Sequence, residues 1–198
     1  MDLRGRVLLS VVAAGRDGST TFVDNMRLPV HGWFRYSAGF SAEWVIDEIR
    51  TRGARRVLDP FAGSGTTLIA AQQAGAEAMG ADAHPFVARI ARAKLGWTAD
   101  PDALEARAKD VLRRARPRPD ADPPALLATC YRPDALAALR GLSHAIDVTA
   151  RGDAVDELLW LALVAILRPC SHVGTAQWQY VLPNRSKSRV VEPRAAFR

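Results

Sequence analysis

The chain has 198 residues, 48% of them apolar, which is enough to bury the core of one domain or of one domain with a small appendage. Five Trp and six Phe argue against general disorder. The net charge of +6 comes from 24 Arg and 3 Lys, and it leaves two interpretations open: a nucleic-acid partner or a biased coding composition. No run approaches the ~20 apolar residues of a membrane-spanning helix, so no membrane partner is expected.

The cysteines and histidines are scattered along the chain. Cys130 and Cys170 form no Cys-x-x-Cys pair, which argues against a disulfide scaffold or a metal site and favours a reducing cytoplasm. The sequence Cys170-Ser171-His172 predicts a loop or packing role. Residues 7–15 superficially resemble a short signal peptide, but a strand or an ordered N-terminal arm is the prediction. We therefore expect a cytoplasmic protein.

The first strong pattern in chain order is an aromatic loop followed by a helix. Residues 27–40 are aromatic and punctuated by glycine, which predicts an ordered loop. Ser41 is a suitable N-cap, and apolar residues recur at helical spacing from Ala42 to Ile49. Gly53 then predicts the end of the helix.

Residues 56–71 predict a short buried strand, a glycine turn and a helix. A doubly wound α/β sheet holds a nucleotide-like cofactor at the carboxyl end of such a strand. Gly63 and Gly65 permit positive φ and a close approach of the backbone to a ligand. The helix that begins near Thr66 presents unpaired N–H groups and the positive end of its dipole.

The residues around this turn distinguish three classes of cofactor. A phosphate-binding P-loop ends in Gly-Lys-Ser/Thr, whereas Thr66 and Thr67 follow Gly65 here. A dinucleotide fingerprint needs a third glycine where this chain has Leu68. Asp59 ends the strand, and a carboxylate there suits a cationic ligand group better than a pyrophosphate. The turn therefore predicts S-adenosylmethionine, which carries an ammonium and a sulfonium group.

The second half of the predicted site lies on the next strand. Residues 77–82 predict that strand, and Asp82 at its end can accept both hydroxyl groups of a ribose. Pro85 predicts the start of the following helix. The core residues predicted for that helix are Phe86, Ile90 and Leu95.

Residues 59–67, Asp-Pro-Phe-Ala-Gly-Ser-Gly-Thr-Thr, resemble the cofactor motif of the amino-group DNA methyltransferases, which make N4-methylcytosine or N6-methyladenine. Residues 80–85 resemble the ribose-binding stretch of that family, and residues 36–45 resemble the segment that covers the methionine end of the cofactor. The likeness covers about a third of the chain. It implies an α/β fold of the Rossmann-like S-adenosylmethionine-dependent methyltransferase type, with an incomplete sheet and a helical insertion or appendage.

The resemblance also implies which residues bind the cofactor. On the methionine side and around the turn they would be Phe40, Ser41, Asp59, Phe61, Ala62, Gly63, Ser64, Gly65 and Thr66. Asp82 would bind the ribose, and Ala83 would lie against the adenine. For the aromatic loop before the strand, the alternative that its rings cover one edge of the core stays open.

Members of this family use a second motif, Asp/Asn/Ser-Pro-Pro-aromatic, for their chemistry. Its oxygens accept hydrogen bonds from the exocyclic amine of a flipped-out base, while the ring stacks on the base. The candidate here, Asp122-Pro123-Pro124-Ala125, lacks the aromatic residue and lies in a proline-rich linker. No catalytic residue is therefore predicted.

The remainder is predicted to be mainly helical. Helices are expected to begin at Asp100-Pro101, at Asp134 and after Asp153. Residues 177–182 alternate like a strand or an extended loop. We expect an S-adenosylmethionine-binding α/β region at 1–99, a helical region at 100–175, and an extended basic tail at 176–198 that stops as a truncated domain would. Either a solvated helix face or contacts with phosphates would explain the outer arginines, Arg107, Arg113, Arg114, Arg116 and Arg118.

The sequence thus predicts the cofactor-binding part of a DNA methyltransferase that acts on an exocyclic amine of a base flipped out of double-stranded DNA. Cytosine N4 is slightly preferred over adenine N6 on the resemblance alone. The missing catalytic motif would lie in a C-terminal half or in a partner chain, so the isolated chain is expected to be inactive. Two alternatives stay open: an RNA methyltransferase of similar fold, and a non-catalytic cofactor- or DNA-binding subunit completed by a partner chain.

Overall fold

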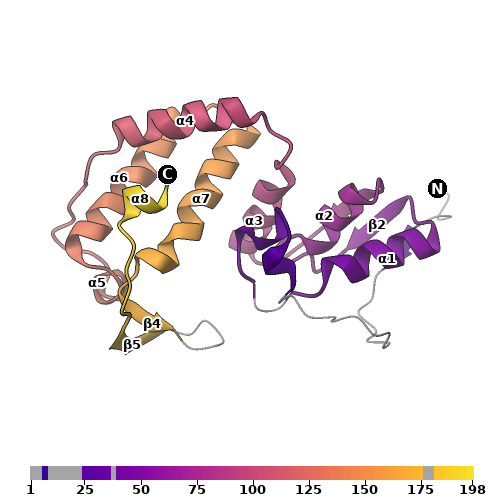
Figure 1. Cartoon of the computed structure of the whole chain (residues 1–198), viewed down its shortest axis with the longest axis horizontal. Helices are drawn as coiled ribbons and strands as arrows, with labels where there is room; N and C mark the ends of the chain where they lie inside the picture. The colour runs from indigo at the N-terminus through magenta and orange to yellow at the C-terminus, as the bar shows by residue number, and fades with distance from the viewer. Residues whose placement is uncertain (1–5, 9–23, 37–38, 176–180) are drawn as a thin grey trace. The chain divides into compact units, whose positions relative to one another are not determined.

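A computed structural model describes residues 6–8, 24–36, 39–175 and 181–198. The chain folds as two compact units, Met1–Trp97 and Thr98–Arg198, the first built around a small sheet and the second mainly of helices (Figure 1). The division at residues 99 and 175 stays a prediction of domain organisation. None of the helices among the described residues is long and apolar enough to cross a membrane.

The first unit is an α/β structure with a three-stranded parallel sheet in the order β1-β2-β3. Its elements are β1 (Arg6–Leu8), the 3-10 helices η1 (Asp24–Arg27) and η2 (His31–Trp33), α1 (Ala42–Arg52), β2 (Arg56–Asp59), α2 (Thr66–Gln73), β3 (Glu77–Gly80) and α3 (Pro85–Leu95). The strand β2 is central because β1 and β3 pair with its two edges. The predicted strand, turn, helix and second strand are confirmed.

The caps of α1 explain why this helix begins and ends where the sequence predicted. The Ser41 hydroxyl accepts a hydrogen bond from the Trp44 N–H at 3.3 Å, and Gly53 ends the helix in the left-handed conformation with φ of 58°. The helix buries Val45 and Ile49 against Val57 of β2. This packing places α1 on the face of the sheet to which Val57 points.

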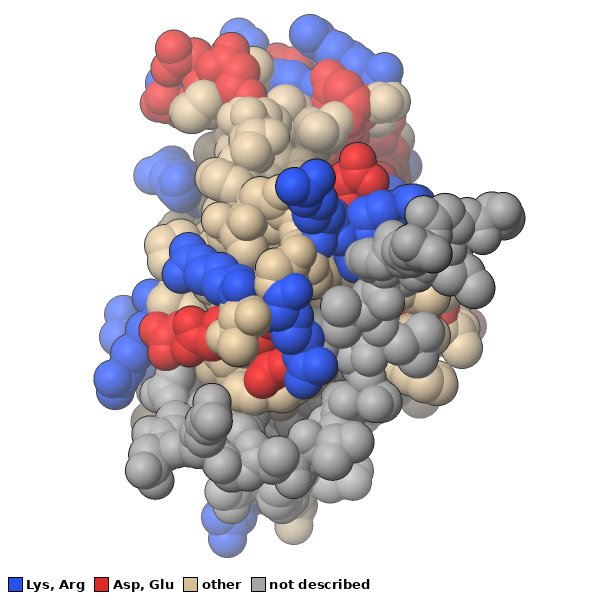
Figure 2. Space-filling model, turned by 90° about the vertical axis from the view of Figure 1, so that its right-hand side faces the viewer, with Lys and Arg blue, Asp and Glu red and all other residues tan. Residues whose placement is uncertain are grey.

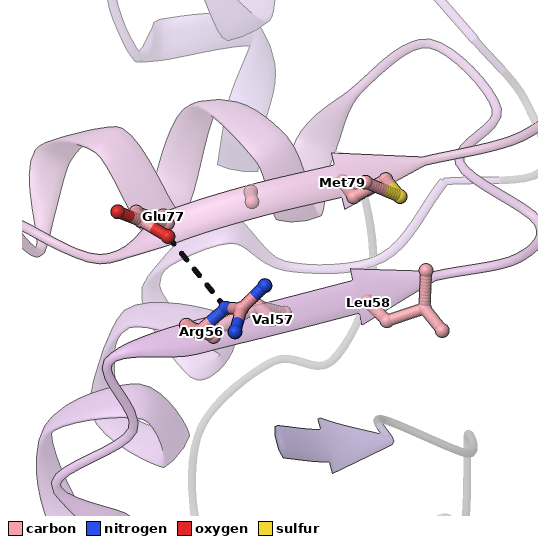
Figure 3. Close-up of a pocket in the computed structure, with 6 residues that line it drawn as sticks. Arg56, Val57, Leu58, Glu77 and Met79 are labelled. Atoms are coloured by element: carbon pink, nitrogen blue, oxygen red, sulfur yellow. Dashed lines mark ion pairs between the residues drawn. The ribbon is translucent and has the colours of Figure 1, made fainter. Parts of the chain in front are cut away.

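The opposite face of the sheet carries the alternate side chains of β2 and β3, because successive residues of a strand point to opposite faces. Leu58 pairs with Met79 in the parallel register, and Arg56 forms an ion pair with Glu77 (Figure 3). Leu58 is half-buried, whereas the Met79 side chain is 69% exposed. This face therefore presents apolar surface to solvent.

The second unit is a group of helices followed by a hairpin. Its elements are α4 (Pro101–Arg114), α5 (Ala125–Cys130), α6 (Pro133–Thr149), α7 (Ala154–Cys170), the antiparallel strands β4 (Val173–Thr175) and β5 (Val181–Ser186), and α8 (Pro193–Ala196). Asp100 caps α4, and a reciprocal capping box between Asp153 and Asp156 begins α7, so the helices predicted at these positions are confirmed. Most of the strand predicted at 177–182 lies outside the described residues.

Arg107 is the clearest departure from the sequence-based prediction. Its side chain does not lie on an outer face: the residue is only 7% exposed, and it bonds both carboxylate oxygens of Asp153 at 2.7 and 2.8 Å. It also pairs with the buried carboxylate of Asp156 and donates to the Thr149 carbonyl. Both interpretations of Arg107, as solvated or as a phosphate contact, are wrong, because its guanidinium pairs with Asp153 and Asp156 at the start of α7.

Two cations near the end of the chain are also used within the fold. The Arg194 guanidinium donates to the carbonyl oxygens of Leu112 at 2.7 Å and Ala115 at 2.8 Å, at the C-terminal end of α4. The Lys187 ammonium donates to the Arg168 carbonyl in the last turn of α7. Cations are favoured at these helix ends, where carbonyl groups lack helical partners. On the face shown in Figure 2, basic side chains lie beside acidic ones.

Candidate cofactor site at the carboxyl end of the sheet

The turn after β2 has the backbone that only glycine adopts readily. Gly63 has φ of 51° and Gly65 has φ of 89°, and Gly65 precedes the first residue of α2. A Cβ on Gly65 would lie 3.1 Å from the Cβ of Ala91 in α3, so there is also little room for a side chain. The tight turn therefore depends on both glycines, for conformation and for the close packing of α3.

Two carboxylates hold the backbone at this edge of the sheet. Asp59 Oδ1 accepts the Phe61 N–H at 3.0 Å. Asp82 bridges two segments: its Oδ2 accepts the Gly63 N–H at 2.9 Å, and its Oδ1 accepts the His84 N–H at 2.8 Å. A carboxylate has about four acceptor positions, so both oxygens of Asp82 can accept further hydrogen bonds. The structure thus brings Asp82 directly to the glycine turn.

The other residues predicted to bind the cofactor fall into three groups. Those of the turn and the start of α2 are buried: Asp59, Ala62, Gly63, Ser64, Gly65 and Thr66. Phe61 is 84% exposed, and Ala83 is exposed as well. The Phe40 carbonyl accepts a hydrogen bond from the Asn25 side chain, and the Ser41 hydroxyl accepts one from the first turn of α1. These bonds fix the segment that leads into α1.

Ser64 carries a polar atom that the fold leaves unsatisfied. The residue is 2% exposed, and its hydroxyl oxygen has no hydrogen-bond partner among the described residues. A buried hydroxyl without a partner costs free energy, and most such groups in proteins are paired. An unpaired hydroxyl inside a glycine turn fits a position where a ligand supplies the missing partner.

The comparisons with known proteins cover this same segment. A family model described as DNA methylase, for the N6 and N4 amino group, matches residues 45–93. Residues 45–93 are therefore similar to the amino-group DNA methylases, and we call them the DNA methylase segment. This DNA methylase segment contains β2, the glycine turn, β3 and Asp82.

Two relatives illustrate the similarity. The type II methyltransferase M.BsoBI of Geobacillus stearothermophilus is 41% identical over 65 residues, which are 31% of this chain and 13% of that protein. The type II methyltransferase M.AvaI of Nostoc sp. is 39% identical over 69 residues, 33% of this chain and 14% of that protein. The chain therefore covers a small part of the length of the curated relatives that it matches. No solved structure is significantly similar to it.

Asn25 and Lys94, near the DNA methylase segment, were not predicted from the sequence, whereas Tyr36 begins the stretch that resembles the cover of the methionine end. A Cβ on Gly63 would lie 3.0 Å from Cε1 of Tyr36, so the tyrosine ring lies beside the turn. The Lys94 ammonium donates to the His31 carbonyl at 2.9 Å in the interior. The sequence could have predicted that Lys94 is buried, because it lies seven residues after Val87 and therefore on the same buried stripe of α3.

The predicted core face of α3 needs one correction. Ile90 is buried as predicted and Leu95 is half-buried, but Phe86 is 41% exposed. Its ring meets Phe34 edge-on at 6.2 Å between centroids, and His84 at 6.3 Å. The prediction of Phe86 as a core residue is wrong because the stripe through Val87 faces the interior, which leaves Phe86 at the margin of the helix.

The buried ammonium of Lys94 makes the stability of the first unit depend on pH. Burial lowers the pKa of Lys94 from 10.5 to about 8. The unfolded chain therefore binds this proton more tightly than the folded chain does. Below pH 8 the buried charge lowers the free energy of unfolding by a constant amount. This destabilisation decreases as the pH rises from 8 to 10.5. We expect wild type to gain up to about 3 kcal/mol of unfolding free energy relative to Lys94→Met over that range, measured by urea titration.

The comparison with Lys94→Met isolates this effect from other groups. Burial raises the pKa of Cys170 from 9.0 to about 11, which makes the second unit lose stability between those pH values. Both proteins contain Cys170, so its contribution cancels in the difference. A difference that stays constant from pH 7.5 to 10.5 would contradict the lowered pKa of Lys94.

A hollow on the sheet lies apart from the glycine turn. It is lined by Arg56, Val57, Leu58, Glu77, Ala78 and Met79, from β2 and β3 (Figure 3). The dashed line in Figure 3 marks the ion pair between Arg56 and Glu77, whose nitrogen and oxygen are 3.6 Å apart. Both residues begin their strands, so this ion pair lies at the opposite end of the sheet from Asp59 and Asp82. The hollow therefore belongs to the face of the sheet, and the predicted cofactor contacts belong to its carboxyl edge.

Proposed function

We propose that this chain forms the S-adenosylmethionine-binding part of a Rossmann-like DNA methyltransferase that modifies an exocyclic base amine. The observation that carries the proposal is the bridge made by Asp82, which joins the glycine turn after β2 to the segment after β3. Asp59, Asp82 and the start of α2 therefore lie at the same edge of the parallel sheet. Ligands of doubly wound sheets bind at that edge. The preference for cytosine N4 over adenine N6 rests on the family resemblance alone.

The residues at the turn fit this cofactor. Asp59 would attract the ammonium of the methionine part, because a buried carboxylate favours a cation. The turn from Gly63 to Gly65 would hold the methionine end, and the Ser64 hydroxyl would find there the partner that the fold does not supply. Asp82 would accept the ribose hydroxyls, and Ala83 would lie against the adenine.

When bound, S-adenosylmethionine supplies an electrophilic methyl group on its sulfonium. Asp59, the glycine turn and Asp82 would bind and orient this methyl donor. The oxygen acceptors that prepare the amine of a flipped-out base belong to a Pro-Pro-aromatic motif, which this sequence does not contain. Double-stranded DNA is the proposed substrate, and the chain alone is expected to transfer no methyl group to it.

Calorimetric titration with S-adenosylmethionine tests the proposal directly. We expect saturable binding that S-adenosylhomocysteine competes for, because both share the ribose and the amino-acid part. ATP and NAD serve as controls for the two cofactor classes that the turn disfavours. The assignment fails if S-adenosylmethionine gives no binding heat, or if NAD binds as tightly. Incubation with labelled S-adenosylmethionine and double-stranded DNA then checks that the isolated chain transfers no label.

A second candidate, a non-catalytic subunit completed by a partner chain, gains support from the open face of the sheet. Leu58 and Met79 lie there beside one another with Met79 well exposed, whereas doubly wound sheets are covered by helices on both faces (Figure 3). Reading the gene past Arg198 separates the two candidates. A Pro-Pro-aromatic motif in the same frame favours one enzyme chain, and a stop codon favours a partner. The RNA methyltransferase alternative would need an RNA-binding module in that frame.

A further inference from the structure

The segment before α1 forms a compact strap beside the glycine turn. We use "strap" for residues 24–36, which contain η1 and η2. The strap doubles back on itself: the His31 N–H donates to the Pro29 carbonyl at 2.7 Å, and a Cβ on Gly32 would lie 2.7 Å from the Met26 carbonyl oxygen. This crowding means that residues 25–32 of the strap pack closely against one another.

Lys94 is one of two anchors of the strap. It is 1% exposed, and its ammonium donates to the carbonyl of His31, which is also buried. A buried ammonium is costly unless it is hydrogen-bonded, so this contact ties the strap to α3. Neither ring nitrogen of His31 has a hydrogen bond of good geometry among the described residues, which leaves the backbone carbonyl as the observed link to Lys94.

Asn25 is the second anchor, at the other end of the strap. Its buried side chain donates to the Phe40 carbonyl at 2.8 Å and accepts the Ala42 N–H at 2.9 Å. These bonds join the strap to Phe40 and to Ala42, the first residue of α1. The edge-on contact between Phe34 and Phe86 adds a further link to α3.

We propose that the strap is one wall of the cofactor site, and that Lys94 and Asn25 are positioning residues that hold the Tyr36 ring against the glycine turn. Gly63 is buried beside that ring, so a ligand at the turn meets Tyr36 as well. The aromatic loop then both covers the core and contributes to binding. The binding role rests on the proposed function, whereas the anchoring of the strap does not.

The test compares Lys94→Met, Lys94→Arg and Ile90→Val. Methionine keeps the apolar stem of lysine without a donor, and arginine keeps a donor. Ile90→Val removes one methyl group from the same buried face of α3 and leaves Lys94 in place. Two readouts are needed: hydrogen exchange of residues 24–36 in the ligand-free chain, and the S-adenosylmethionine dissociation constant.

For Lys94→Met we expect faster exchange across the strap and about tenfold weaker S-adenosylmethionine binding, the loss of roughly one buried hydrogen bond. Lys94→Arg should restore much of both, and Ile90→Val should change neither strap exchange nor affinity. Tyr36→Ala should weaken binding while Tyr36→Phe retains it, and this pair leaves both anchors intact.

The outcomes separate the parts of the inference. Unchanged strap exchange in Lys94→Met would overturn the anchor. Two results would contradict the strap as a wall of the cofactor site. One is faster strap exchange in Lys94→Met with unchanged S-adenosylmethionine affinity, and the other is wild-type affinity in Tyr36→Ala. If wild type binds no S-adenosylmethionine, the proposed function and the wall both fail, whereas the exchange data still decide the anchor. Equal effects of Ile90→Val and Lys94→Met would show that Lys94 only stabilises α3.

Discussion

Replacement of Asp82 by Ala is expected to weaken S-adenosylmethionine binding at least about a hundredfold. Two losses add together. The ribose hydroxyls lose their charged acceptor, and the N–H groups of Gly63 and His84 lose the carboxylate that joins them. Asp82→Asn should be nearly as weak, because one oxygen of the bridge becomes an NH₂ group that cannot accept.

Calorimetric titration measures this effect, and Asp47→Ala is the matched control. Asp47 is an exposed carboxylate on the outer side of α1, so its removal changes the net charge equally without touching the turn. Asp59→Ala should also weaken binding, through loss of attraction for the ammonium. Equal affinities of wild type, Asp82→Ala and Asp59→Ala would exclude the proposed cofactor contacts.

In the second unit, Arg107→Met is expected to lower the free energy of unfolding by about 3 to 5 kcal/mol, because it leaves the carboxylate of Asp156 buried without its cation. Asp156 is 8% exposed and also accepts the N–H groups of Arg151 and Gly152 at the start of α7. Urea denaturation followed by far-ultraviolet circular dichroism, to which the helices of this unit contribute, measures the change.

The charge at this position can be separated from the packing. Adding Asp153→Asn and Asp156→Asn to Arg107→Met removes the uncompensated charge while both side chains keep an oxygen for capping, so much of the lost stability should return. The exposed pair of Lys109 and Glu105 is the control, and Lys109→Met should have little effect. A loss no larger for Arg107→Met than for Lys109→Met would show that the buried pairs contribute nothing.

The local elements of this chain were predictable because short-range chemistry sets them. Ser41 and Gly53 bound α1, and Asp153 begins α7, through hydrogen bonds and dihedral angles within a few residues. The turn at Gly63 and Gly65 was equally readable, since its positive φ values demand glycine. The similarity of residues 45–93 to the DNA methylases includes the same short stretch of sequence.

The roles of charged residues were much less predictable. The sequence predicted Arg107 as an outer arginine and placed Arg194 in a basic tail. Arg107 instead pairs with residues 46 and 49 positions away, and Arg194 binds carbonyls about 80 positions away. Lys94 lies on a buried stripe, but the carbonyl that it binds is 63 positions distant. Hydrophobic periodicity shows which side of a helix is buried, but it cannot show which distant residue that side contacts.

By itself, the sequence determined the strand, the glycine turn, the two acids and the similarity of their segment to the DNA methylases. Only the tertiary structure decided that Asp82 bridges to the Gly63 N–H, that Ser64 keeps an unpaired hydroxyl, and that Tyr36 lies against the turn. The physical reason is the range of the interactions. Backbone conformation and caps depend on neighbours along the chain, whereas burial and pairing depend on segments that meet only when the sheet and helices pack.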